Sequence, residues 1–419
     1  MNRDYDIIIV GAGPAGATTA LYAKRHGLRV LLLDKRSFPR DKICGDAVAR
    51  KSLGYLRDLG LLDEVRAETH EPIGRAVLSA PSGAHIDVSL NSDGREEDPH
   101  LVCRREIFDN VLVRAAKCEL DVTEGCGVRD VVRDENGAVC GVRTNDGEIS
   151  ARVVVGADGF NSIVARKLGL YRHDSNRWWI ATRQYFRDLE VAPGTVEVHY
   201  LDDTLPGFLW MFPTGDGTVN VGLGMVHHDI RRRDNGIRAV HEHAINDSRL
   251  RERFEGATPL GGVHGFNLPT PDSKRVIAGS GFMLTGDAAG LVDPFSGEGI
   301  GNAMCSGELA ARVAAQACEA KRAPEAHALL RSYPSQLWDA LDRRELSLHY
   351  KLRNIARRRR LVNFLIGRAA ARPELMDWLS GMTAEHGAVE RKRALTSPLT
   401  YFRLMMRGRR KDASRQASR

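Results

Sequence analysis

The sequence predicts an α/β fold built on a discontinuous Rossmann-like domain, with an inserted antiparallel-sheet domain and a helical C-terminus. Three observations carry this prediction. First, the apolar run at 5–10 leads into a glycine-rich turn, an alanine-rich helical stretch and a second apolar run at 29–33, as in a βαβ unit. Second, segments between 178 and 226 alternate between apolar and polar residues, as in an antiparallel sheet. Third, residues 276–286 return to a buried-strand pattern, and a helical stretch follows at 299–320.

The intervening segments have patterns of their own. In chain order they predict helical structure over 47–66, short strands and turns over 72–103, an amphipathic helix over 105–118, alternating strands and turns over 120–155, and a buried strand ending in a glycine turn over 152–159.

The bulk composition is that of a soluble globular protein with more than one domain. The chain has 419 residues, of which 42% are hydrophobic and 27% charged. Its net charge of +7 favours anionic partners such as phosphate-bearing cofactors, nucleic acid or an acidic membrane surface. The seven cysteines form no CxxC pair, which argues against a disulfide framework or a zinc site. We see neither a signal peptide nor a transmembrane run, and therefore expect a cytoplasmic protein that can also rest on the inner face of the membrane.

A GxGxxG turn, formed by Gly11, Gly13 and Gly16, lies between the first two predicted strands. In this pattern the first glycine permits a tight turn, the second lets the backbone approach a pyrophosphate, and the third lets helix and strand pack closely. The start of the following helix presents free N–H groups to the phosphates. Asp34 ends the second strand, where an acid can accept hydrogen bonds from ribose hydroxyls. The turn therefore predicts a site for FAD or NAD rather than NADP.

Two more glycine-rich motifs follow predicted strands later in the chain. They are GADG at 156–159 and TGDAAG at 285–290, and the second leads to GEGI at 297–300. With the RxxFD segment at 105–109, they resemble the flavoprotein hydroxylase superfamily, whose members share GxGxxG, a central DG motif and a C-terminal GD motif. The resemblance implies that the cofactor is FAD.

The same resemblance implies roles for individual residues. Asp287 would hold a ribityl hydroxyl, and Arg105 would contact the pyrophosphate or ribityl region. Gly299 and Ile300, at a helix start, would stabilise negative charge on reduced flavin through backbone N–H groups. Val128 is expected to provide a backbone contact to the adenine. The complete set of predicted cofactor-binding residues is Gly11, Gly13, Ala15, Gly16, Asp34, Lys35, Cys44, Gly45, Arg105, Val128, Asp158, Asp287, Gly299 and Ile300.

Two local segments resemble the geranylgeranyl reductase family within this superfamily. Residues 38–46 (FPRDKICGD) are similar to that family's PxxxxCG segment, and residues 207–213 (GFLWMFP) to its YxWxFP segment, with Phe208 in place of Tyr. The similarity covers about residues 1–325. It implies reduction of C=C bonds in a hydrophobic isoprenoid, carried by an archaeal-type lipid, a chlorophyll-pathway geranylgeranyl group or the side chain of menaquinone.

The resemblance also indicates which residues act on the substrate. Cys44 lies in the loop expected to cover the flavin ring, and it is our candidate for assisting proton transfer or positioning the alkene. The alternative is a packed, inert thiol, because free cysteines are commonly buried. Phe208, Trp210 and Phe212 are predicted to form an apolar slot for the isoprenoid chain, with ordinary sheet core as the alternative.

The domain boundaries are predicted from these motifs and from changes in pattern. They give an FAD-binding domain at 1–75, 101–175 and 270–325, a substrate-binding domain at 76–100 and 176–269, a helical C-terminal region at 326–407, and a tail at 408–419 that we expect to be disordered.

Basic residues over 343–360 precede the apolar run 361–366, and 401–407 is a second basic and apolar patch. Both predict peripheral contact with an anionic membrane, with a solvated helix face as the alternative. A nucleic-acid partner is not expected, because we see no aromatic platform and no known binding module.

Other activities remain open at this stage. An FAD-dependent aromatic monooxygenase, using NAD(P)H and O₂, would fit Asp158 in GADG equally well. A flavin-dependent halogenase usually has GES where this chain has CGD at 44–46, and WxWxIP where it has 208–213. A flavin-bearing binding protein without catalysis is a third alternative.

Two features of the sequence bear on cofactors other than FAD. No second NAD(P)H-binding βαβ unit is visible, so the electron donor is expected to be transiently bound NAD(P)H or a ferredoxin-like protein. The histidines at 227–228 and 241–243 are interpreted as solvated loop residues rather than metal ligands. We therefore predict no metal site.

Overall fold

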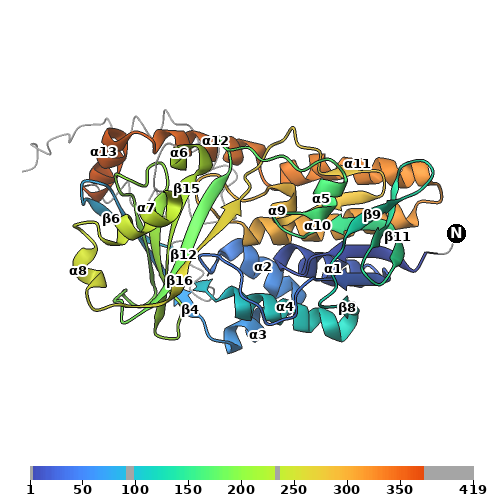
Figure 1. Cartoon of the computed structure of the whole chain (residues 1–419), viewed down its shortest axis with the longest axis horizontal. Coiled ribbons are helices and arrows are strands. Elements are labelled where there is room, and N and C mark those ends of the chain that lie inside the picture. Colours follow the sequence, from blue (N-terminus) through green and yellow to red (C-terminus); the bar gives the residue numbers. More distant parts are fainter. Residues whose placement is uncertain (1–2, 91–98, 232–235, 372–419) are drawn as a thin grey trace, which may run out of the picture.

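The computed structural model describes residues 3–90, 99–231 and 236–371, and its elements form an elongated molecule with two large sheets and a small third one (Figure 1). The N-terminal β1 and α1 lie in one half with α10 and α11, and the second sheet occupies the other half. This architecture confirms the predicted α/β fold with a Rossmann-like part, a separate largely antiparallel sheet and C-terminal helices.

The first sheet is parallel at its centre. β1 (Tyr5–Val10) pairs in parallel with β2 (Val30–Leu33) and with β11 (Glu148–Gly156), and β11 pairs in parallel with β18 (Phe282–Leu284). The middle of β1 is fully buried, as expected for a strand covered on both faces. Each of these strands ends at a predicted motif or at Asp34, so the carboxyl edge of the sheet brings four distant segments together. The sheet also contains β8 (Asp121–Thr123), β9 (Asp130–Arg133), β10 (Val139–Arg143) and β17 (Ala278–Gly279).

Helices cover this sheet and begin at its carboxyl edge. α1 (Pro14–Arg25) packs against α10 (Ile300–Glu319) so closely that a Cβ at Gly307 would lie 2.6 Å from the Ala15 carbonyl oxygen. α1 begins inside the GxGxxG turn, and α10 begins at the end of GEGI. Their close packing therefore fixes these two motifs relative to each other. Three further helices border this region: α4 (Arg105–Glu119), α5 (Ile163–Lys167) and α9 (Gly286–Ala289).

The second sheet has the strand order β16-β12-β15-β14-β13-β5-β6 and is antiparallel except for the parallel β13–β5 pair. Strands from before and after the α4 segment therefore meet in one sheet. Its strands are β5 (Arg75–Ser79), β6 (His85–Ser89), β12 (Trp179–Arg187), β13 (Thr195–His199), β14 (Phe208–Pro213), β15 (Thr218–Val226) and β16 (Thr258–Leu268). A small third sheet contains β3 (Ala47–Val48), β4 (Glu71–Ile73) and β7 (His100–Val102).

Two local predictions need correction. The segment predicted as helical over 47–66 is helical in α2 (Arg50–Leu59) and α3 (Leu62–Ala67), which are separated at Gly60 with φ +76°, but it begins with strand β3. His241 is not a solvated loop residue but is fully buried in α7 (Gly236–Ile245), with its Nδ1 2.9 Å from the Thr182 hydroxyl. Burial lowers the pKa of His241 to about 4, which keeps the imidazole neutral.

The C-terminal helices cover both halves of the molecule. They are α11 (Ala323–Ala340), α12 (Arg343–Ile355) and α13 (Arg359–Ala370). Val362 and Ile366 of α13 belong to the same buried cluster as Trp179 and Phe208 of the second sheet. Within the ranges that the structure describes, no helix is long and apolar enough to cross a membrane. The predictions for 401–407 and 408–419 lie outside the described residues.

An ion cluster joins β13 to α8 (Arg251–Phe254) and gives a stability prediction. Glu197 lies 2.9 Å from His199 Nε2 and 2.6 Å from Arg253 Nη1. Burial raises the Glu197 pKa, but the hydrogen bonds from His199 and Arg253 outweigh it and bring the pKa to about 2. A carboxyl whose pKa falls on folding stabilises the native state above its unfolded pKa of 4.5, and this contribution is lost as the pH falls toward 2.

We therefore expect Glu197→Gln to lower the free energy of unfolding at pH 7 by about 2–3 kcal/mol. The difference from the wild type should shrink steadily as the pH is lowered from 4.5 toward 2. Urea unfolding across this pH range is the measurement. A difference that does not change with pH would show that the effect comes from packing rather than from the carboxylate charge.

Candidate functional site

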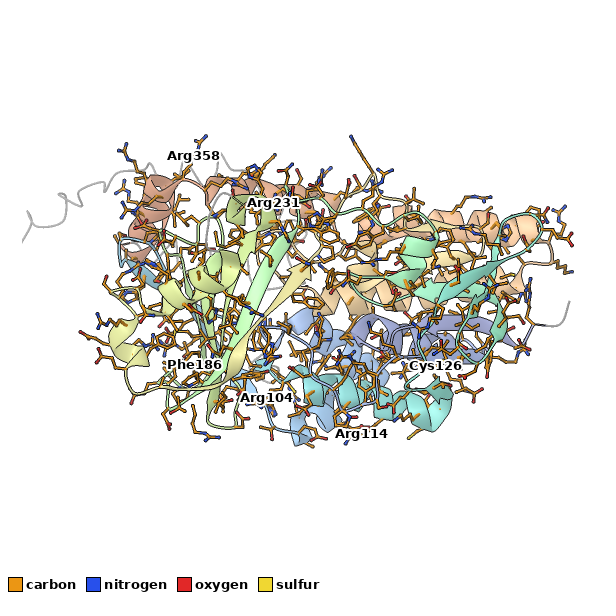
Figure 2. The ribbon with its side chains drawn as sticks, viewed as in Figure 1. Arg104, Arg114, Cys126, Phe186, Arg231 and Arg358 are labelled. Carbon is orange, nitrogen blue, oxygen red and sulfur yellow. The ribbon has the colours of Figure 1, made fainter. Side chains whose placement is uncertain are left out.

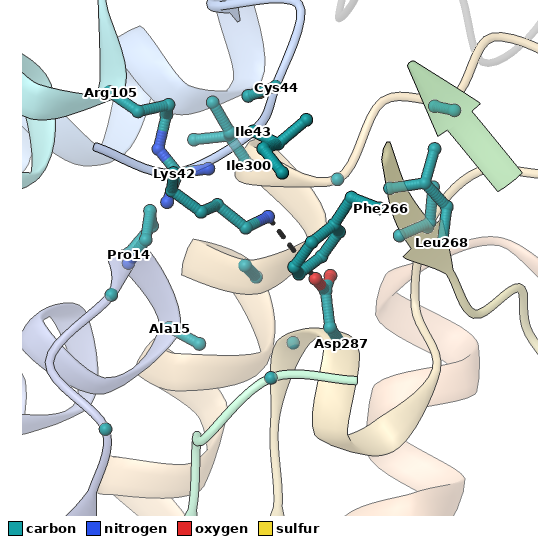
Figure 3. Close-up of a pocket in the computed structure, with 18 of the residues that line it drawn as sticks. Pro14, Ala15, Lys42, Ile43, Cys44, Arg105, Phe266, Leu268, Asp287 and Ile300 are labelled. Atoms are coloured by element: carbon teal, nitrogen blue, oxygen red, sulfur yellow. Dashed lines mark hydrogen bonds and ion pairs between the residues drawn. The ribbon is translucent and has the colours of Figure 1, made fainter. Parts of the chain in front are cut away.

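A cavity of 1070 Å³ lies between the carboxyl edge of the first sheet and strands β12, β14, β15 and β16 of the second (Figure 3). Of the residues predicted from the sequence, all but Gly16 line this cavity. They are Gly11, Gly13, Ala15, Asp34, Lys35, Cys44, Gly45, Arg105, Val128, Asp158, Phe208, Trp210, Phe212, Asp287, Gly299 and Ile300. The fold therefore gathers the sequence motifs around one cavity.

The GxGxxG turn has the geometry that a pyrophosphate requires. Gly11 has φ +101°, and a Cβ there would lie 2.5 Å from the Ala157 carbonyl oxygen. Gly13 is the N-cap of α1 and makes no side-chain capping hydrogen bond, so the helix start is left open toward the cavity. Gly16 does not line the cavity, but a Cβ there would lie 1.7 Å from the Gly11 carbonyl oxygen. Its role is to let α1 pack on the turn.

Asp34 lies at the end of β2 and is 7% exposed. Its Oδ2 accepts a hydrogen bond of 2.8 Å from the Ala12 N–H, and its Oδ1 accepts one of 2.8 Å from the Arg36 N–H. These bonds fix the carboxylate against the glycine turn. Each carboxylate oxygen can accept a second hydrogen bond, so the ribose contacts that the sequence predicts remain compatible with this arrangement.

Two arginines share one carboxylate beside the glycine turn. Arg105 donates to both oxygens of Asp109, at 2.7 and 2.8 Å, and Arg40 Nη1 lies 3.1 Å from Asp109 Oδ2. Two positive charges against one negative charge leave this part of the cavity with excess positive charge, which suits a pyrophosphate. The Arg40 Nη2 lies 3.6 Å from where a Cβ of Gly13 would be.

Arg105 also connects the phosphate end of the cavity to the thiol of Cys44. Burial lowers the pKa of Arg105, but the nearby Asp109 carboxylate and the Cys44 side chain outweigh this effect and raise it. The guanidinium is thus permanently charged beside a half-buried thiol.

Asp158 has one hydrogen-bonded and one open carboxylate oxygen. Its Oδ2 accepts from the backbone N–H groups of Ile163 at 2.6 Å and Val164 at 3.3 Å, at the start of α5. Its Oδ1 is buried and has no partner among the described residues, although Asp158 lines the cavity. Burial raises the pKa of this carboxyl. A buried oxygen without a partner at a cavity wall indicates a place for a ligand.

Lys42 reaches across the cavity toward Asp287, as Figure 3 shows. Its Nζ lies 3.5 Å from Asp287 Oδ2 and 4.7 Å from the centre of the Phe266 ring. Gly299, the N-cap of α10, makes no side-chain capping hydrogen bond. Together with Ile300 it presents a positively polarised helix start to the cavity.

One wall of the cavity is aromatic. Phe208, Trp210 and Phe212 of β14 line the cavity with Trp179 of β12. Trp210 and Trp179 lie over glycines of β15: a Cβ at Gly222 would lie 1.9 Å from a ring carbon of Trp210, and one at Gly224 would lie 3.1 Å from Trp179. The aromatic residues are therefore both sheet core and cavity wall, because small residues beneath them let the rings lie along the sheet.

The residues present fit FAD in shape and chemistry. The glycine cradle and excess positive charge suit the pyrophosphate, and Asp34 is available to the ribose. The start of α1, which has no side-chain cap, places partial positive charge at the cavity. The start of α10 also lies at the cavity, and there the Glu298 carboxylate accepts a hydrogen bond from the Gly301 N–H. Sequence reasoning missed Arg40 and Lys42, although both lie in the segment 38–46 that it singled out. Their roles depend on which side chains face them across the cavity.

Comparison with known proteins agrees with this site. The FAD binding domain family matches residues 4–334. The chain is 31% identical to the menaquinone reductase of Mycolicibacterium smegmatis over 75% of this chain and 77% of that protein. It is 31% identical to the digeranylgeranylglycerophospholipid reductase of Methanocella arvoryzae over 85% and 88% of the two chains.

Solved structures share the fold. A geranylgeranyl bacteriochlorophyll reductase-like protein from Thermoplasma acidophilum superposes with a TM-score of 0.77 at 24% identity, covering 93% of this chain and 99% of its own. A flavin-dependent brominase superposes with a TM-score of 0.73 at 21% identity, covering 96% and 99%.

The fold, the cavity and these matches define an FAD-dependent oxidoreductase. Within that class the chain belongs to the geranylgeranyl reductase family, as its motifs predicted.

Proposed function

We propose that this protein reduces C=C bonds of a hydrophobic isoprenoid chain, with FAD as its cofactor. The observation that carries the proposal is the position of the Cys44 thiol, which lines the same cavity as the flavin motifs and the aromatic wall of β14. An alkene offers no charge to bind, so an apolar aromatic slot is the recognition surface that its chemistry requires. The names of the relatives from Mycolicibacterium and Methanocella both refer to reductases of molecules that bear isoprenoid chains.

Residues at different places along the cavity have different roles. Arg105, with Arg40 beside it, would hold the pyrophosphate at the open start of α1. FAD bound there in its reduced form would provide the hydride for one alkene carbon. Cys44 supplies the proton for the other carbon, and the guanidinium of Arg105 stabilises the thiolate that remains. Trp210 and Phe208 bind the chain and exclude water from the reacting carbons.

Substrate delivery and the electron donor complete the proposal. Arg358 lies on the outer side of the C-terminal helices (Figure 2), next to Arg360 and to Phe364, which is 40% exposed. A basic and apolar surface of this kind suits peripheral contact with an anionic membrane that holds the isoprenoid, on the cytoplasmic side. Transiently bound NAD(P)H or a ferredoxin-like protein reduces the flavin.

The test follows the flavin spectrum without oxygen. Purified protein is reduced with dithionite and mixed with either a geranylgeranyl lipid or menaquinone. We expect the flavin to reoxidise and the product to gain two hydrogen atoms for each reduced bond, measured by mass spectrometry. The fully saturated lipid serves as the control and should leave the flavin reduced. With menaquinone, whose quinone ring can itself accept electrons from reduced flavin, the gain of two hydrogen atoms in the side chain is the readout.

Each alternative activity gives a different outcome. Reoxidation that needs O₂, with one oxygen atom added to a phenolic substrate, would replace the proposal by a monooxygenase. A halide incorporated under O₂ would replace it by a halogenase. Flavin that stays reduced with every alkene offered would also contradict it, in favour of a flavin-bearing binding protein.

A further inference from the structure

The residue two places after Cys44 is a buried carboxylate in an unusual backbone conformation. Asp46 is fully buried and has φ +63°, a region that residues other than glycine rarely adopt. Its Oδ2 accepts hydrogen bonds from Tyr185 Oη at 2.6 Å and Asn220 Nδ2 at 2.7 Å. Its Oδ1 accepts one from the Arg105 N–H at 3.3 Å. The carboxylate thus connects the Cys44 loop to β12, β15 and α4.

Asn220 extends this connection in two directions. Its Nδ2 also donates to the Cys44 carbonyl oxygen at 2.8 Å, and its Oδ1 accepts from Trp210 Nε1 at 3.0 Å. It is fully buried in β15. One side chain therefore holds both the residue that bears the thiol and a ring of the aromatic wall. A Cβ at Gly45 would lie 3.4 Å from Trp210 Nε1, which shows how closely the loop packs on this wall.

Between the end of β2 at Leu33 and the start of β3 at Ala47, the chain forms no helix or strand. Such a loop takes its position largely from side-chain contacts. Ion pairs hold its middle at Arg40, Asp41 and Lys42. Its thiol-bearing end at 44–46 is held by the side-chain bonds of Asp46 and Asn220, and by the Cys103 N–H, which donates to the Asp46 carbonyl oxygen at 2.9 Å.

From this geometry we infer that Asn220 and Asp46 are positioning residues that hold the Cys44 thiol at a fixed place over the aromatic slot. They act through the loop and do not need to touch the substrate. Burial raises the Asp46 pKa to about 6, against the hydrogen bonds of Tyr185 and Asn220 and the charges of Arg183 and Arg105. Burying a carboxyl costs free energy that a neutral side chain at this position would not, which indicates that Asp46 has a role beyond packing. The inference rests on the proposed role of Cys44 in the reaction.

The test measures the reactivity of the thiol rather than turnover alone. FAD-loaded wild type and Asn220→Ala are treated with iodoacetamide, and alkylation of each cysteine is followed by peptide mass spectrometry. We expect Cys44 in the variant to react about 10-fold faster, because a loop that loses these hydrogen bonds opens more often. The reduction rate should fall by a similar factor, with the Kd for FAD unchanged.

The protein contains its own controls. Cys118 is exposed on α4 and should react at the same rate in both proteins, whereas Cys103 and Cys305 are buried and should stay unlabelled. Asn246→Ala removes an exposed asparagine that donates to the Glu242 carbonyl, and it should behave as wild type. Labelling of the buried cysteines in Asn220→Ala would show that this variant has unfolded. In that case Tyr185→Phe, which removes a single hydrogen bond to Asp46, is the deciding variant in the same assay.

An unchanged or slower Cys44 alkylation in the deciding variant would overturn the inference. Because alkylation needs no alkene, this result is separate from the fate of the proposed function. Faster alkylation in an enzyme that reduces no isoprenoid would keep the positioning role and reject only the substrate.

Discussion

Gly16→Ala is expected to yield a protein that no longer retains FAD. The added Cβ would lie 1.7 Å from the Gly11 carbonyl oxygen and 3.2 Å from the Ala157 Cβ. The first contact is with backbone, so no side chain can turn away and α1 must move off the turn. We expect the Kd for FAD to rise by at least about 100-fold, because the phosphate cradle and the helix start separate while overpacking costs roughly 1–3 kcal/mol.

The measurement is FAD titration by fluorescence, together with the flavin absorbance of the purified protein. Gly54→Ala is the matched control, because Gly54 lies in α2 with nothing within 4 Å of an added Cβ. That substitution should leave FAD binding unchanged and stabilise the helix by about 0.5–1 kcal/mol. Full FAD retention by Gly16→Ala would mean that the close packing of α1 on the turn is not what shapes the site.

Cys44→Ala is expected to have the second large effect, on catalysis rather than on binding. Loss of a positioned proton donor lowers rates by roughly 10²–10⁴-fold. The flavin should remain bound, since Gly13, Arg105 and the helix starts are untouched. Anaerobic reoxidation of the reduced flavin by the isoprenoid is the direct readout, and it should slow by the same factor as steady-state turnover.

Cys118→Ala provides the control, because this exposed thiol lies on α4 and does not line the cavity. It should leave both rates unchanged. If Cys44→Ala reduces the isoprenoid at the rate of the wild type, the thiol is a packing residue, and the proton comes from another group on the cavity wall.

The flavin motifs were predictable because each is local. GxGxxG with Asp34 occupies one βαβ unit, and the Asp158 and Asp287 motifs each follow an apolar strand. Glycine at Gly11 reflects its φ of +101°, and glycine at Gly16 reflects the close approach of the Gly11 carbonyl, so the pattern carries a local physical reason. The helical prediction over 47–66 holds for α2 and α3 but misses the first residues, which pair as a strand of the small sheet with a segment distant in sequence.

Other features depend on residues that are distant in sequence. Asn220 lies 176 positions from Cys44, and nothing in its own neighbourhood distinguishes it from a polar residue on a half-exposed strand. His241 was misread for the same reason, since only the packing of α7 on β12 shows that it is buried beside Thr182.

The sequence by itself determined that this is an FAD-binding α/β oxidoreductase of the geranylgeranyl reductase family, because glycine turns, strand runs and short motifs are set by local sterics. Only the tertiary structure decided that the Cys44 loop is fastened to the aromatic wall through Asp46 and Asn220. It also placed Arg40 and Lys42 at the cavity. Hydrogen bonds and ion pairs between separate elements form only once the sheets are brought together, so no local sequence pattern predicts them.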